Sequence, residues 1–185
     1  MRNFVLAMAA ALTVFSSAAM AGEVTGEARF GNSRNDGPDS TEYALQYNDT
    51  VANALNLGVE LEANQLSNEG DLATAFTGKV GPALPTVYGF KPVVYVEAGR
   101  VLTEGDNFNV WGAGVEVSRR VYGPVSASVG YRYRLGASSD QLRENRYNVG
   151  LAADVTKEVG VGLGYYYTTG TTETEAVGVS LTRSF

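Results

Sequence analysis

Apolar and polar residues alternate along most of the chain with a period of two, as in a β-strand that has one apolar face. In residues 125–135, VSASVGYRYRL, one face carries Val, Ala, Tyr and Leu, and the other carries Ser, Gly and Arg. The pattern predicts an all-β protein. It divides into ten strands near residues 23–31, 40–48, 51–62, 72–80, 87–102, 108–121, 125–135, 146–155, 158–168 and 174–185.

Two kinds of turn-forming segment alternate between these strands. One set is mostly short, at residues 48–50, 81–86, 122–124 and 155–158. The other is mostly longer and more polar, at residues 32–40, 64–71, 103–107, 136–145 and 169–173. Short turns at one end and longer loops at the other are typical of a barrel that crosses a membrane. The strands at 72–80 and 87–102 are the weakest, because Pro82, Pro85 and Pro92 lie in or beside them. Without these two strands the barrel would have eight.

Two hairpins show how well the alternation specifies the register. A turn centred on Gly123 gives the pairs Val117–Val129, Val115–Tyr131, Ala113–Tyr133 and Trp111–Leu135, with Arg132 opposite Gly114 and Arg134 opposite Gly112. A turn centred near Thr156 gives Ala153–Val159, Leu151–Val161, Val149–Leu163 and Tyr147–Tyr165. Apolar residues then meet on one face, whereas large residues meet small ones on the other. A slip of one residue would break both patterns.

The composition of the two faces indicates which one is the interior. The charged face is rich in Gly, Ser and Ala, which suits a crowded interior better than a surface in water. The apolar face carries aromatic residues near strand ends, as in membrane-interface girdles: Tyr43, Tyr47, Trp111, Tyr131, Tyr133, Tyr147, Tyr165, Tyr167 and Phe185. In hydrocarbon the backbone must satisfy its own polar groups, so the sheet must close. We therefore expect a closed antiparallel up-and-down transmembrane β-barrel over residues 22–185; the alternative is a soluble β-fold.

The N-terminus has the three parts of a secretory signal peptide. Arg2 is followed by the apolar stretch FVLAMAAALTVF and by the small residues Ala19–Ala21. We expect cleavage after Ala21 and export of the mature chain. The sequence has no Cys and no His, so the usual thiolate nucleophile, general base and soft metal ligands are missing. We expect no enzymatic activity, no metal and no cofactor. A net charge of −6 argues against a nucleic-acid partner.

The last strand ends in AVGVSLTRSF, which places Val177, Val179, Leu181 and Phe185 on one face. Together with the signal peptide and the alternating strands, this ending resembles the bacterial outer-membrane β-barrel proteins across the whole mature chain. The resemblance implies an outer-membrane location, contact with outer-membrane lipid, and recognition of these four residues by the barrel-assembly machinery. Arg183 departs from the family's usual apolar residue. The RYR triplet at residues 132–134 resembles, more faintly, the narrow oligogalacturonate porins; small porin-family and OmpA-like barrels fit equally well.

The interior face carries the candidate functional residues. Its charged residues are Glu23, Glu27, Arg29, Glu42, Glu60, Glu62, Lys79, Glu97, Glu116, Arg120, Arg132, Arg134, Arg146, Asp154 and Glu158. The candidates for selectivity are Arg132, Arg134, Arg146, Glu116, Glu97, Glu60 and Glu62, and Glu116 is expected to pair with Arg132. One hypothesis is a passive channel whose arginines attract polar or anionic solutes across from an acidic wall. The alternative is a non-conducting structural or surface-interaction barrel filled by ion pairs.

Overall fold

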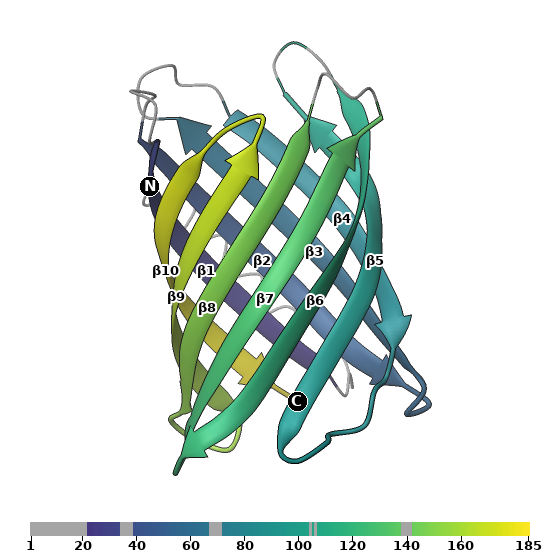
Figure 1. Cartoon of the computed structure of the whole chain (residues 1–185), viewed down its shortest axis with the longest axis vertical. Helices are drawn as coiled ribbons and strands as arrows, with labels where there is room; N and C mark the ends of the chain where they lie inside the picture. The colour runs from purple at the N-terminus through teal and green to yellow at the C-terminus, as the bar shows by residue number, and fades with distance from the viewer. Residues whose placement is uncertain (1–21, 34–38, 67–71, 104, 106, 138–141) are drawn as a thin grey trace.

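The chain forms a closed antiparallel β-barrel of ten strands (Figure 1). The computed structural model describes residues 22–33, 39–66, 72–103, 105, 107–137 and 142–185, so the predicted signal peptide lies outside the described residues. The strands are β1 (Gly22–Ser33), β2 (Ser40–Val51), β3 (Leu55–Leu66), β4 (Leu72–Pro82), β5 (Phe90–Leu102), β6 (Phe108–Tyr122), β7 (Val125–Gly136), β8 (Arg143–Asp154), β9 (Val159–Gly170) and β10 (Thr174–Ser184). The ten-strand prediction is confirmed, and the eight-strand alternative is wrong.

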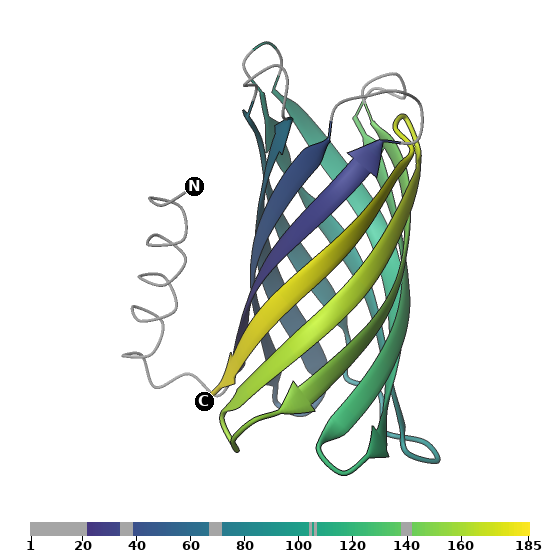
Figure 2. The same ribbon diagram turned by 90° about the vertical axis from the view of Figure 1, so that its left-hand side faces the viewer.

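The barrel closes where its first and last strands meet. β1 and β10 run side by side and antiparallel (Figure 2). The Phe185 N–H donates to the Gly22 carbonyl at 2.9 Å, so the final residue completes the seam. Both ends of the barrel sequence therefore lie with the turns 52–54, 83–89, 123–124 and 155–158, which we call the short-turn end. The connections between the other strand ends form the long-loop end.

The predicted register is correct in one hairpin and wrong in the other. All the predicted β6–β7 pairs are present, including Arg132 opposite Gly114. In the β8–β9 hairpin the register differs by two residues, because the turn is centred on Lys157 rather than on Thr156. The Thr156 hydroxyl accepts hydrogen bonds from the N–H groups of Glu158 and Val159, at 3.2 and 3.0 Å, and these bonds shape the wider turn. A shift of two residues keeps every side chain on its predicted face.

Four strands also have bounds that differ from the prediction by three residues or more. β2 continues to Val51, and the turn to β3 is formed by Ala52 and Asn53, which both have a φ of 53°. β3 therefore spans 55–66 rather than 51–62. β5 begins at residue 90 rather than 87, because residues 87–90 form a small turn of their own. β8 begins at residue 143 rather than 146.

The outer wall is apolar and the interior is charged. On neighbouring strands Val129, Leu151, Leu163 and Val179 point outward with 47–60% of their surface exposed. Inside, Glu60 and Arg134 are only 1% and 3% exposed. This polarity is the reverse of a water-soluble fold, in which apolar side chains fill the interior. None of the described residues forms a helix that is long and apolar enough to span a membrane.

Candidate functional site in the barrel lumen

Glu62 of β3 is the centre of an ionic cluster inside the barrel. Its carboxylate oxygens lie 2.7 Å from a guanidinium nitrogen of Arg134, 3.0 Å from Arg132 and 3.1 Å from Arg146. Arg29 approaches the same carboxylate at 3.5 Å. Four guanidinium groups from β1, β7 and β8 thus converge on one side chain from β3.

Two further carboxylates extend the cluster along the wall of β3–β5. Glu60 accepts from Lys79 Nζ at 2.8 Å and lies 3.1 Å from Arg132. Glu97 accepts from Arg134 Nε at 3.0 Å. Arg132 and Arg134 are two residues apart on β7, so both point inward, and each reaches across the lumen to this acidic wall.

Arg29 and Arg146 connect the remaining carboxylates. Arg29 pairs with Glu27 at 2.6 Å and also with Glu42. Arg146 pairs with Glu42 at 3.0 Å and with Glu144 at 3.3 Å. The result is one continuous network, which we call the constriction. It comprises Arg29, Lys79, Arg132, Arg134, Arg146, Glu27, Glu42, Glu60, Glu62, Glu97 and Glu144.

Two tyrosines complete the constriction, and glycines make room for it. Lys79 Nζ lies 5.1 Å from the centre of the Tyr95 ring, so the ammonium also contacts an aromatic face. A Cβ atom on Gly114 of β6 would lie 2.3 Å from this ring. On the other side Arg29 stacks 4.4 Å from the Tyr166 ring, whose hydroxyl donates to Glu27. The expectation that small residues face large ones inside the barrel is therefore confirmed.

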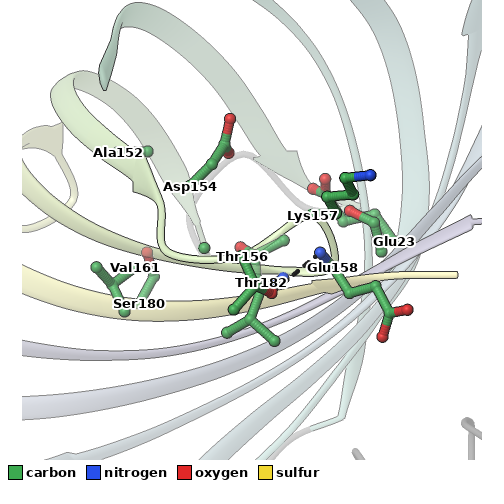
Figure 3. Close-up of a pocket in the computed structure, with 12 residues that line it drawn as sticks. Glu23, Ala152, Asp154, Thr156, Lys157, Glu158, Val161, Ser180 and Thr182 are labelled. Carbon is green, nitrogen blue, oxygen red and sulfur yellow. Dashed lines mark hydrogen bonds between the residues drawn. The ribbon is translucent and has the colours of Figure 1, made fainter. Parts of the chain in front are cut away.

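Beyond the constriction, toward the short-turn end, the lumen is open to water. Glu23, Lys91 and Glu116 are exposed here, and Arg120 pairs with Asp154 at 2.7 Å. A pocket of about 180 Å³ at the rim is lined by polar residues, including Glu23, Asp154 and Thr182, and by apolar ones, including Val159 and Val161 (Figure 3). We call this part of the lumen the vestibule.

Toward the long-loop end one wall of the lumen is apolar. Ala75, Val101 and Val110 form a buried cluster, and Phe108 and Leu142 pack against it. These residues lie on the lumen-facing positions of β4, β5 and β6 and in the connection before β8. We call them the apolar cap. The sequence analysis did not anticipate it, because single apolar residues on the polar face do not disturb the alternation.

Most of the predicted lumen residues come together. Arg132, Arg134, Arg146, Glu60, Glu62 and Glu97 all belong to the constriction. Glu116 does not: it lies in the vestibule, and the predicted pair of Glu116 with Arg132 is wrong. Arg132 instead pairs with Glu60, Glu62 and Glu144, at 3.0–3.1 Å.

Glu144 belongs to the constriction but was not among the predicted lumen residues. Residues 136–145 were interpreted as one polar loop, but β8 begins at Arg143. The alternation of Glu144, Arg146 and Asn148 on one face was the available signal. Among the described residues, no group of three or more acidic side chains is arranged to hold a metal ion.

The four residues of the proposed assembly signal lie on the outside of the barrel. Val177, Val179 and Leu181 are 45–54% exposed on the outer face of β10, and Phe185 is 37% exposed. The guanidinium of Arg183 stacks 5.1 Å from the Phe185 ring. Recognition by assembly machinery stays a prediction.

Comparison with known proteins identifies the fold. LpxR from Salmonella typhimurium matches with a TM-score of 0.50 and 11% identity, covering 88% of this chain and 100% of that one. The fold is that of an outer-membrane β-barrel. A KdgM porin matches with a TM-score of 0.46 and 15% identity, over 87% of this chain and 99% of that one. An outer-membrane channel from Pseudomonas putida F1 matches with a TM-score of 0.46 and 11% identity, covering 91% of this chain and 97% of that one.

No family model and no curated protein matches the sequence. The similarity to the solved barrels is one of fold alone, because the sequences are only 11–15% identical. The function must therefore be inferred from the side chains inside this barrel.

Proposed function

We propose that the protein is a small passive channel of the bacterial outer membrane, for small polar solutes. In this proposal the signal peptide is removed after Ala21, and the short-turn end faces the periplasm, as in other barrels of this fold. The apolar outer wall supports placement in lipid. The charged lumen supports a polar path through the barrel, with no catalytic step.

The observation that carries the proposal is a set of buried polar atoms, in and beside the constriction, that lack a hydrogen-bond partner. Six buried side-chain atoms have no hydrogen-bond partner among the described residues, although Arg146 Nε lies 3.3 Å from Glu144 in their ion pair: Asn64 Oδ1, Thr77 Oγ1, Glu97 Oε2, Arg132 Nε, Arg134 Nη2 and Arg146 Nε. Three are oxygens on β3–β5, and three are guanidinium nitrogens on β7 and β8. Folded proteins satisfy such atoms with water when the chain offers no partner.

A hydrated constriction is continuous with the open vestibule, so the two together form most of an aqueous path. The apolar cap completes the path at the long-loop end and makes it narrow. Hydrophobic constrictions of this kind regulate flow because water leaves them readily. We therefore expect low conductance and brief openings rather than the large steady current of a wide porin.

Planar-bilayer recording of the refolded protein tests the proposal. Reproducible steps of small conductance are expected, and Phe108→Ser should enlarge them or lengthen the openings by making the cap polar. Val115→Ser is the matched control, because Val115 lies on the outer face of the same strand. A membrane that stays silent with both the native protein and Phe108→Ser would favour the alternative, a filled structural barrel.

A further inference from the structure

We infer that the lumen favours cations over anions, and that Glu116 of β6 is a residue that determines this selectivity. The inference rests on the proposed channel function for its transport consequence, but the local attraction of cations can be tested without transport. The ligand class is small inorganic and organic cations.

The arginines of the constriction do not offer free positive charge to a passing anion. Each is held by at least one carboxylate at 2.6–3.1 Å. The constriction contains five cationic side chains and six carboxylates: Arg29, Lys79, Arg132, Arg134 and Arg146 against Glu27, Glu42, Glu60, Glu62, Glu97 and Glu144. The net charge of the constriction is therefore slightly negative, although the sequence analysis expected its arginines to attract anions.

The vestibule adds negative charge that is accessible to solutes. Arg120 and Asp154 cancel each other through their ion pair. Lys157 and Glu158, which also line the rim pocket, carry opposite charges. Glu23 and Glu116 remain, against Lys91 of β5, which lies opposite Ser118. Glu116 is exposed, and in the described part of the chain its carboxylate makes no ion pair or side-chain hydrogen bond.

The position of Glu116 on β6 allows its carboxylate to attract cations in the vestibule. It faces the lumen between Gly114 and Ser118 on β6, and its cross-strand partner on β7 is Gly130. Its partner on β5 is Val93, but the small neighbours on β6 and β7 leave the carboxylate exposed, so its field extends into the water of the vestibule. A charged group in a cleft with low-dielectric walls concentrates ions of opposite sign.

The first test measures ionic selectivity. The reversal potential of the full mature barrel is recorded in a planar bilayer across a potassium chloride gradient. We expect preference for potassium, and Glu116→Gln should shift the reversal potential toward that of chloride. The matched control is Glu175→Gln, which removes the same charge from an outward-facing position of β10. A chloride preference in the native protein, or equal shifts in the two variants, would overturn the inference and leave the channel intact.

The second test needs no conductance. Because the chain has no Cys, Ser118→Cys introduces a single thiol on the lumen face, two residues from Glu116. Its modification rates by a cationic and an anionic methanethiosulfonate are compared in the folded barrel at low salt. A unit charge about 7 Å away in water changes each rate by about threefold, in opposite directions. Adding Glu116→Gln should therefore lower the cation-to-anion rate ratio by about ninefold, whereas adding Glu175→Gln should leave it unchanged.

The two tests separate the two claims. No current combined with the expected change in rate ratio would refute the channel and support cation attraction. Current combined with an unchanged rate ratio would support the channel and refute the role of Glu116.

Discussion

Glu62→Gln is the substitution that most directly tests the ionic constriction. It keeps the shape of the side chain but removes the negative charge at the point where Arg134, Arg132, Arg146 and Arg29 converge, at 2.7, 3.0, 3.1 and 3.5 Å. With its side chain 7% exposed, Glu62 is screened little by water. Removing one partner of a buried ion pair costs about 3–5 kcal/mol, because the other charges lose their compensation. We expect a loss of about this size in the free energy of unfolding.

The assay is reversible denaturant unfolding in lipid vesicles, followed by tryptophan fluorescence. Trp111 is the only tryptophan and is 55% exposed on the outer wall, so its emission reports transfer from lipid to water. Glu116→Gln serves as the matched control and should change stability by no more than about 0.5 kcal/mol. If Glu62→Gln and Glu116→Gln lower the free energy of unfolding by the same small amount, the Glu62 carboxylate does not stabilise the ionic cluster and the reasoning fails.

Three other predictions concern the wall, the end of the chain and the cap. Gly114→Ala should lower stability by about 1–3 kcal/mol in the same unfolding assay, because its Cβ would overlap the Tyr95 ring; Gly78→Ala, whose Cβ would have no neighbour nearer than 3.9 Å, should cost less. Deleting Phe185 should reduce the amount of heat-modifiable, folded barrel in outer-membrane fractions; an unchanged amount would remove it from the assembly signal. Phe108→Leu, which keeps the cap apolar, should leave the bilayer conductance near that of the native protein, in contrast to Phe108→Ser.

The alternation of residues was sufficient to predict the barrel because each strand has a lipid face and a lumen face. This two-fold choice fixed the face of the predicted lumen residues that lie on strands, and the register around Gly123. Glu158, also predicted on the lumen face, lies instead in the turn between β8 and β9 and pairs with Arg183 at 4.0 Å. The alternation could not fix the β8–β9 register, because a shift of two residues preserves both faces. That hairpin depends on the hydrogen bonds of the Thr156 hydroxyl, which are a property of the turn.

The partners inside the lumen could not be predicted from neighbouring strands. The expected partner of Arg132 was Glu116, on the adjacent strand, but Arg132 pairs with Glu62, which is 70 residues away in sequence. Such contacts depend on the curvature and stagger of the closed sheet, which bring β7 opposite β3. A two-residue periodicity contains no information about that distance. Glu144 was missed for a simpler reason, because polar residues at a strand end resemble a loop.

The long span of the ionic cluster has a consequence for how the protein enters the membrane. Its arginines come from β1, β7 and β8, and its carboxylates come mainly from β1–β3. A single hairpin such as β7–β8 would carry the three guanidinium groups of Arg132, Arg134 and Arg146 into lipid with only Glu144 as a counter-ion. Each charge left without a partner costs several kcal/mol. Stepwise insertion of separate hairpins is therefore disfavoured. We therefore expect β1–β3 to insert together with β7 and β8, so that the sheet is nearly complete before it enters the bilayer.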